Sequence, residues 1–279
     1  MLLSPRYGSP PVIVIEPRLP GPHPILQQRR RLEAMLADLT DAEWRHPSRC
    51  AGWAVQDVVS HLTSTNGFWA LSIQAGLTGA PTQFLGAFDP VATPAQLAEQ
   101  EQGMPPGEAL ERLRASTAAL AAVVDSLGPA DWQVMAEAPP GHLPIALVAD
   151  HALWDCWVHE RDIVLPLGRP AVVESDEVLT CLHYGAALGS AFESCAGVAT
   201  ARTVALEVHD PDACIVVTTD GESVRVAAGP PPGDAVAGDG DAVELLEMLS
   251  TRDVGRPAPA VVQMLTAGLA TVFDQAVGP

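Results

Sequence analysis

The fold of this chain is decided by residues 151–163, which read HALWDCWVHERDI. His151, Asp155 and His159 recur every four residues, and side chains at this spacing lie on one face of an α-helix. Leucine, tryptophan and valine fill most of the positions between them, which predicts a buried helix. A buried polar stripe needs partners, because an unpaired polar group inside a protein costs free energy.

A second helix, expected from about residue 54, offers such a partner. His61 lies among Val58, Val59 and Leu62, so it is expected to face the same interior as the first stripe. Two imidazoles and one carboxylate, from His61, Asp155 and His159, suit zinc or another divalent cation with coordination positions left open. Open positions favour catalysis over a purely structural role. The alternative is a site without metal, in which the histidines only form hydrogen bonds.

Two further residues are candidates for supporting this metal site. Asp57 precedes His61 by one helical turn and either orients that imidazole or serves as an acid in the first turn of its helix. His151 is a fourth ligand, an orienting group or a substrate contact, unless it is a partly exposed helix residue. The pattern leaves these alternatives open.

The first 170 residues predict a helical bundle behind a proline-rich arm. Residues 1–24 hold seven prolines and are expected to form an extended arm that packs on the surface or is disordered. Apolar spacing predicts helices near 25–38, 54–71, 106–127 and 142–165, with a turn at 40–53 and a long loop at 78–105 that contains one short helical piece. Four helices with one long connection indicate a four-helix bundle over residues 25–170.

The remaining residues, 171–279, predict a small α+β domain with helices on one face of a sheet. A helix is expected at 174–195, then strands near 203–208, 214–219, 223–227 and 234–237. Turn signals at 209–212 and 220–221 separate the first three strands. Helices near 242–250 and 258–277 are expected to close the chain.

Composition argues against several classes of partner and location. Acidic residues outnumber basic ones by 34 to 15, giving a formal charge of −19, so nucleic acid and anionic membrane surfaces are disfavoured. No long apolar run predicts a membrane span, and the N-terminus lacks the pattern of a secretory signal. Five irregularly spaced cysteines do not form a disulfide framework and fit a reducing cytoplasm.

Several segments together resemble a known family. Residues 39–44 (LTDAEW), 49–62 (RCAGWAVQDVVSHL), 157–163 (WVHERDI) and 167–170 (LGRP) are similar to the signatures of the mycothiol-dependent maleylpyruvate isomerase family. That family belongs to the wider group of DinB-like metalloproteins. Residues 238–252 resemble the end of its second domain, which is similar to sterol-carrier folds. The resemblance covers roughly residues 25–275.

The resemblance implies a zinc site at the same three positions, His61, Asp155 and His159. The family usually has glutamate where this chain has Asp155, and the shorter side chain implies a cation closer to its helix or held less tightly. Arg252 aligns with a family arginine that could hold a substrate carboxylate. The alternative for Arg252 is a helix C-terminal residue that satisfies backbone carbonyls. Cys50 and Cys156 are disfavoured as nucleophiles.

Two hypotheses for function follow. The first is a zinc-dependent isomerase or S-transferase that uses mycothiol or a similar low-molecular-weight thiol on an electrophilic small molecule. A cation beside sulfur lowers the thiol pKa, which makes the thiolate available at neutral pH. The second is a non-catalytic module on the same fold that binds metal and a ligand or a protein partner. The sequence does not identify the substrate or the oligomeric state.

Overall fold

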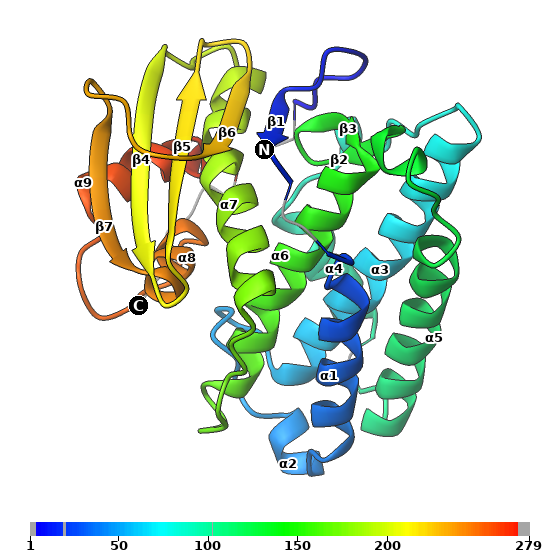
Figure 1. Cartoon of the computed structure of the whole chain (residues 1–279). Helices are drawn as coiled ribbons and strands as arrows, with labels where there is room; N and C mark the ends of the chain where they lie inside the picture. The colour runs from blue at the N-terminus through cyan, green and yellow to red at the C-terminus, as the bar shows by residue number, and fades with distance from the viewer. Residues whose placement is uncertain (1–3, 19–20, 102, 273–279) are drawn as a thin grey trace.

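The computed structural model describes residues 4–18, 21–101 and 103–272 and contains both helices and sheet. Four long helices form one group on one side of the molecule (Figure 1): α1 (Ile25–Ala37), α3 (Val55–Leu77), α5 (Pro106–Val124) and α6 (Ile145–Val164). Helix α3 contacts α5 and α6, and α1 contacts the same two helices. The predicted starts of α1, α3 and α5 are confirmed to within one residue.

Helix α6 is buried on almost every face, because the helix group packs on one side of it and a further helix packs on the other. The helix begins three residues later than predicted. The residues just before it form an antiparallel hairpin of β2 (Met135–Ala138) and β3 (Gly141–Pro144), which the sequence interpretation missed. The tight Ala138–Gly141 connection uses Gly141, whose φ is +129° and whose Cα lies against the Arg6 backbone.

Two connections that were predicted as turn and loop are more regular than expected. A capping box formed by Thr40 and Glu43 starts the short helix α2 (Asp41–Trp44) within the predicted turn. The 78–105 region contains the 3₁₀ turn η1 (Leu85–Ala87) and helix α4 (Ala92–Gln100). The single helical piece expected there is therefore present, with an additional turn before it.

A five-stranded mixed sheet forms the other side of the molecule, with strand order β1-β6-β5-β4-β7 (Figure 1). Its later strands are β4 (Arg202–His209), β5 (Ala213–Thr219), β6 (Val224–Ala228) and β7 (Val236–Asp241). Strand β5 runs antiparallel to both of its neighbours, β4 and β6, whereas β7 pairs with β4 in parallel. Helices α7 (Ser175–Cys195), α8 (Ala242–Leu249) and α9 (Ala260–Thr266) pack against the sheet, and η3 (Ala267–Thr271) follows α9. The predicted helix over 258–277 is thus shorter, and its last five residues lie outside the described ones.

The N-terminal arm contributes the first strand of this sheet. Residues β1 (Ile13–Glu16) pair in parallel with β6, so that Ile13 lies opposite Val224. Val12 and Ile13 are fully buried. The arm is extended here as predicted, but this segment belongs to the sheet and is neither disordered nor packed on the surface: a continuous run of β-branched apolar residues at 12–15 makes a strand despite the prolines on either side.

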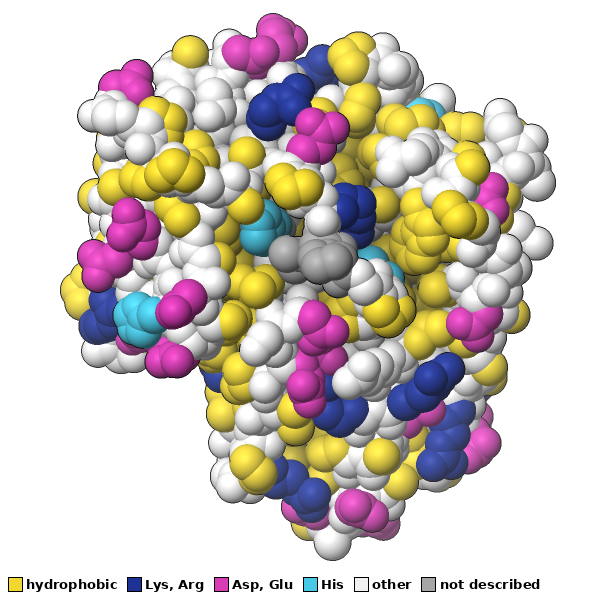
Figure 2. Space-filling model, in the orientation of Figure 1, with side chains coloured by type: hydrophobic (Ala, Val, Ile, Leu, Met, Phe, Trp, Pro, Cys, Tyr) yellow, Lys and Arg dark blue, Asp and Glu magenta, His cyan; other side chains and the backbone are white. Residues whose placement is uncertain are grey.

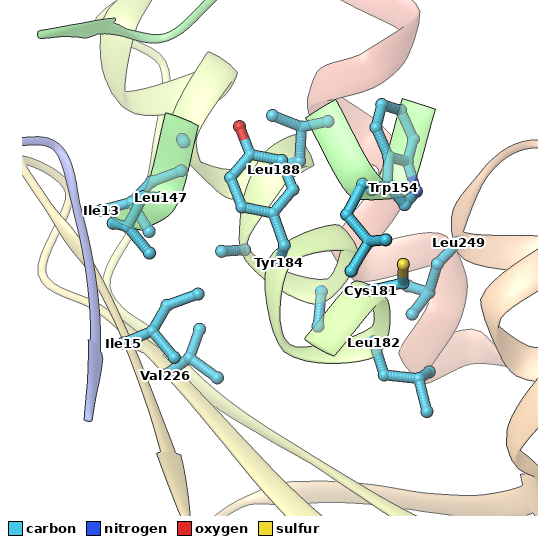
Figure 3. Packing of buried hydrophobic residues seen from close by; sticks show 14 of the residues in the cluster. Ile13, Ile15, Leu147, Trp154, Cys181, Leu182, Tyr184, Leu188, Val226 and Leu249 are labelled. Carbon is cyan, nitrogen blue, oxygen red and sulfur yellow. The ribbon is translucent and has the colours of Figure 1, made fainter. Parts of the chain in front are cut away.

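Helix α7 lies between the helix group and the sheet and joins the two through a common core. Figure 3 shows Tyr184 of α7 between two groups of side chains: Leu147 of α6 with Ile13, Ile15 and Val226 of the sheet on one side, and Trp154 of α6 on the other. Gly189 lets α7 approach α9 closely, because a Cβ there would lie 2.0 Å from the carbonyl oxygen of Leu265.

The assignment of the helix group to DinB-like bundles, and of the sheet to sterol-carrier folds, stays a prediction. So does the division of the chain at residue 170. Within the described residues, no helix combines the length and apolarity that crossing a membrane requires. Figure 2 shows acidic and basic side chains scattered over one face, without a broad basic area.

Candidate functional site

The candidate site lies between α3 and α6, which cross so that the early residues of one helix face the late residues of the other. The rings of His61 and His159 stack edge to face with centroids 4.8 Å apart. Two turns further along, the rings of Trp69 and His151 lie 4.9 Å apart. These two contacts fix the register of the helices and bring the predicted ligands together.

His61, Asp155 and His159 form a compact group whose potential ligand atoms all lie within 4.8 Å of one another. The Nε2 atoms of His61 and His159 lie 3.5 and 3.7 Å from Asp155 Oδ1. Burial alone would raise the pKa of Asp155. The nearby imidazoles of His61, His159 and His151 lower it by more than burial raises it, so the carboxylate is charged. The structure brings these three predicted side chains together, and their role as metal ligands stays a prediction.

A divalent cation fits this donor set. Oδ2 of Asp155 is buried and has no hydrogen-bond partner, which is costly for a carboxylate oxygen unless a cation binds it. Both imidazoles present Nε2 on the same side of the carboxylate. Two nitrogens and one carboxylate are a ligand set of the kind that catalytic zinc uses. The shorter side chain of Asp155, compared with glutamate, still reaches both histidines.

Asp162 orients His159, and sequence reasoning did not identify this role. The Nδ1 atom of His159 lies 3.0 Å from Asp162 Oδ2, on the same helix face three residues later. An imidazole that donates from Nδ1 to a carboxylate keeps the Nε2 lone pair free for a cation. The signal was the i, i+3 spacing of the two residues on a helix already predicted to be buried.

Two arginines from distant segments bind the same carboxylate. Arg252, which follows α8, reaches Asp162 with Nε at 2.9 Å and Nη2 at 2.7 Å. Arg49, which precedes α3, donates from Nε at 3.0 Å and pairs with Glu247 of α8 at 2.8 Å. The side chain of Asp162 is fully buried, and the hydrogen bonds and charges of Arg252 and His159 hold its pKa far below the ordinary range against the effect of burial. The network ties α6 to α8 directly beside the candidate metal ligands.

Arg252, the predicted contact for a substrate carboxylate, lines the cavity of the site but is already engaged. Its Nε and Nη2 bind Asp162, and its Nη1 donates to the carbonyl oxygen of Ser250 at the end of α8. The latter bond is the carbonyl contact that the alternative interpretation expected.

Asp57 and His151, the two residues predicted to support the metal site, differ in their contacts. Asp57 accepts a hydrogen bond from the backbone N–H of Ala54 at 2.8 Å, which is the role of an acid in the first turn of a helix. His151 is buried in the cavity wall, with Nδ1 2.8 Å from the hydroxyl of Tyr184. It does not belong to the group of ligand atoms within 4.8 Å. Burial lowers the pKa of His151 to about 4, so its ring is neutral at pH 7.

The cysteines near the site are poor nucleophiles. Cys50 lies 3.2 Å from Asp162 Oδ2 and 3.6 Å from His159 Nδ1, and burial together with the charge of Asp162 raises its pKa to about 12. Cys156 is fully buried, and burial raises its pKa to about 12 as well. A thiol is reactive as the thiolate, so neither is activated at neutral pH.

The metal ligands open into a cavity of about 580 Å³, within the range of small-molecule sites. Its walls come from α3, α6, α7, η1, α4, the segment 49–53, the end of α8 and η3. The 78–105 region, which was predicted to be a loop with one short helical piece, therefore supplies one wall of the site.

Comparison with known proteins supports the fold and the family. The family model described as the mycothiol maleylpyruvate isomerase N-terminal domain matches residues 25–164, half of the chain. The crystal structure of the mycothiol-dependent maleylpyruvate isomerase is similar to this chain with a TM-score of 0.57 and 15% identity, over 83% of this chain and 89% of that one. A histidine-to-alanine mutant of such an isomerase gives a TM-score of 0.56 and 15% identity, over 84% and 95%. At this identity the likeness concerns the fold. No curated protein matches the chain.

Proposed function

Because the chain belongs to the mycothiol maleylpyruvate isomerase family, we propose that it is a metal-dependent isomerase or S-transferase acting on an electrophilic small molecule. The thiol it uses would be mycothiol or a similar low-molecular-weight thiol. One observation carries the proposal: the two imidazoles of His61 and His159 meet a carboxylate with an unpartnered buried oxygen at the wall of a large cavity.

His61, Asp155 and His159 would hold the cation, with zinc the best match for this donor set. A divalent cation bound there supplies one thing: it lowers the pKa of a thiol and so provides a thiolate nucleophile at neutral pH. Asp162 keeps the His159 ring in the tautomer that leaves Nε2 free. Arg49 and Arg252 in turn hold Asp162 in its ionised form and fixed position.

The cavity walls bind and orient the electrophile and exclude water from it. His151 presents a neutral ring to the cavity and can exchange a hydrogen bond with the substrate without carrying charge. Arg252 is a candidate substrate contact, because a remaining N–H of its Nη1 would reach a substrate oxygen. Reversible thiol addition to a double bond gives cis–trans isomerisation, whereas retention of the thiol on the product gives transfer.

The experiment is a thiol-dependent assay of the zinc-supplemented protein, with mycothiol and maleylpyruvate, the compound named for the related enzyme. His61→Ala should lower the rate by about 100-fold or more, because loss of a metal ligand removes the thiolate source. The matched control is His46→Ala, since His46 is exposed and lies outside the cavity.

Thiol-dependent loss of the substrate that disappears in His61→Ala supports the proposal. Equal rates for wild type, His61→Ala and the reaction without protein, across several thiols and electrophiles, would contradict it. That result would leave the alternative hypothesis of a non-catalytic module that binds metal and ligand.

A further inference from the structure

The cavity beside the metal ligands is polar at one end and apolar at the other. Its lining includes His61 and His159 at one position along α3 and α6, and Trp69 and His151 at another. Eight residues of helix separate His159 from His151, which corresponds to about 12 Å at 1.5 Å per residue. A bound molecule can therefore place one end at the cation and the other end well away from every metal ligand.

The far end is built by η1 and its neighbours. The backbone N–H groups of Phe84 and Leu85 donate to the carboxylate of Glu137, at 3.0 and 2.8 Å. The backbone of Glu137 is held in turn by the hydroxyl of Ser72, close to the C-terminal end of α3. Ser72 lies eleven residues beyond His61, so these contacts fix η1 at the end of the cavity that is remote from the metal ligands.

Aromatic side chains are concentrated in this cavity. The chain has five phenylalanines, and all four that the structure describes line it: Phe68, Phe84, Phe88 and Phe192. Trp53, Trp69 and Trp154 line it too. Aromatic residues make up only 5% of the sequence, so their concentration around one cavity points to a ligand with an apolar, preferably aromatic, body.

Cationic groups lie only at the metal end. Arg49 and Arg252 are the lysine or arginine residues in the described lining, and both are bound to Asp162. Glu137, the acid next to η1, accepts from Tyr7 as well as from the two backbone groups, so its charge is matched by donors. A second carboxylate on a substrate would therefore lie among phenylalanine rings without a counter-charge, which is unfavourable.

The mouth of the cavity is also apolar. Phe84, Val91 and Leu97 line it and are 58%, 44% and 38% exposed. A cluster of exposed large apolar side chains is typical of a binding surface.

We propose that the electrophile used at this site is a molecule with one large apolar, preferably aromatic, group and a reactive end, not a dicarboxylate with charges at both ends. This inference rests on the proposed function and names the substrate class of the same site. The reactive end lies at the metal ligands, and the apolar group lies against Phe68, Phe84, Phe88 and Phe192.

The first test measures binding alone, with the full-length, metal-depleted protein and no thiol. The probes are 4-phenylbutan-2-one, a neutral aromatic ketone without the conjugated double bond to which a thiol adds, and maleate, a small dianion. The readout is tryptophan fluorescence, since three tryptophans line the cavity. The aromatic ketone should bind at least about tenfold more tightly than maleate.

A pair of variants locates the binding. Phe88→Ser should weaken binding of the aromatic ketone about fivefold or more, because the side chain is half-buried in the cavity wall. Leu71→Ser is the control, since Leu71 is 48% exposed on α3 and does not line the cavity. Tighter binding of maleate, or equal binding of the ketone by wild type and Phe88→Ser, would overturn the inference.

The second test measures turnover by the zinc-supplemented protein with mycothiol, comparing cis-4-phenylbut-3-en-2-one with maleylpyruvate. The inference expects a higher kcat/KM for the aromatic enone, and a higher value for maleylpyruvate would overturn it. Aromatic binding with no turnover of either compound would contradict the proposed function but support the apolar character of the site. The two failures are therefore distinguishable.

Discussion

Replacement of Asp162 by asparagine is expected to destabilise the protein strongly. The side chain of Asp162 is fully buried and accepts from Arg252 at two nitrogens, from Arg49 and from His159. Asparagine has no charge and replaces one accepting oxygen with a donor, so the partly buried guanidinium groups of Arg49 and Arg252 lose this charged partner. Breaking a buried ion pair by removal of one partner costs about 3–5 kcal/mol.

The assay is urea denaturation followed by tryptophan fluorescence. With an m-value of about 3 kcal/mol/M, a loss of this size lowers the midpoint by roughly 1–2 M urea. The matched control is Asp41→Asn, because Asp41 pairs with Arg45 at the surface and both side chains are largely exposed. The control should leave the midpoint unchanged, because exposed ion pairs contribute little.

The pH dependence has a definite sign. The folded protein holds the pKa of Asp162 below its unfolded value of about 3.9, so the unfolded chain takes up the proton first as the pH falls. The stability that this carboxylate contributes is therefore fully present above about pH 5 and is lost as the pH falls below 4. The difference between wild type and Asp162→Asn should be constant from pH 7 to 5 and shrink below that. A loss under about 1 kcal/mol at pH 7, or a difference that grows on acidification, would refute the reasoning.

Three further predictions concern the close approach of α7 to α9, the first strand and the thiol beside the site. Gly189→Ala should destabilise the protein by more than about 1 kcal/mol, because its Cβ would lie 2.0 Å from a backbone oxygen of α9. The control Gly67→Ala should stabilise α3, because a Cβ there meets no atom within 4 Å. A higher melting temperature for Gly189→Ala than for Gly67→Ala would contradict this. Ile13→Ala should lower the free energy of unfolding, measured by urea denaturation, by about 2–5 kcal/mol, because Ile13 is fully buried in β1. The control is Val198→Ala, at an exposed position. Equal, small losses for the two variants would show that the arm is dispensable. Cys50 should react with iodoacetamide at pH 7 far more slowly than a free thiol, because its pKa is raised to about 12. Mass spectrometry follows the alkylation, and a rate near that of free cysteine would show that Cys50 is not held as a neutral thiol.

Local spacing predicted the part of the site that lies on single helices. His151, Asp155 and His159 were recognisable because a four-residue repeat fixes one helix face, and His61 because it interrupts an apolar face. The pairing of Arg49 and Arg252 with Asp162 was not predictable in this way. These residues lie 113 and 90 positions from Asp162, and only the tertiary fold brings them together.

The first strand and the cavity wall were missed for related reasons. Prolines on either side of residues 12–15 obscured a short apolar run whose partner, β6, lies about 200 residues later in the chain. The 84–97 segment has no strong periodicity, and its apolar residues acquire meaning only when Glu137 fixes η1 at the end of α3. Non-local contacts of this kind leave no local spacing to read.

The central claim is that His61, Asp155 and His159 bind a divalent cation, and metal analysis by mass spectrometry tests it most directly. Wild type, His159→Ala and the exposed control His46→Ala would be supplied with zinc, freed of excess and compared. We predict about one zinc ion per chain in wild type and in His46→Ala, and loss of the ion in His159→Ala. A wild-type protein that retains no metal, or an undiminished zinc content in His159→Ala, would contradict the account.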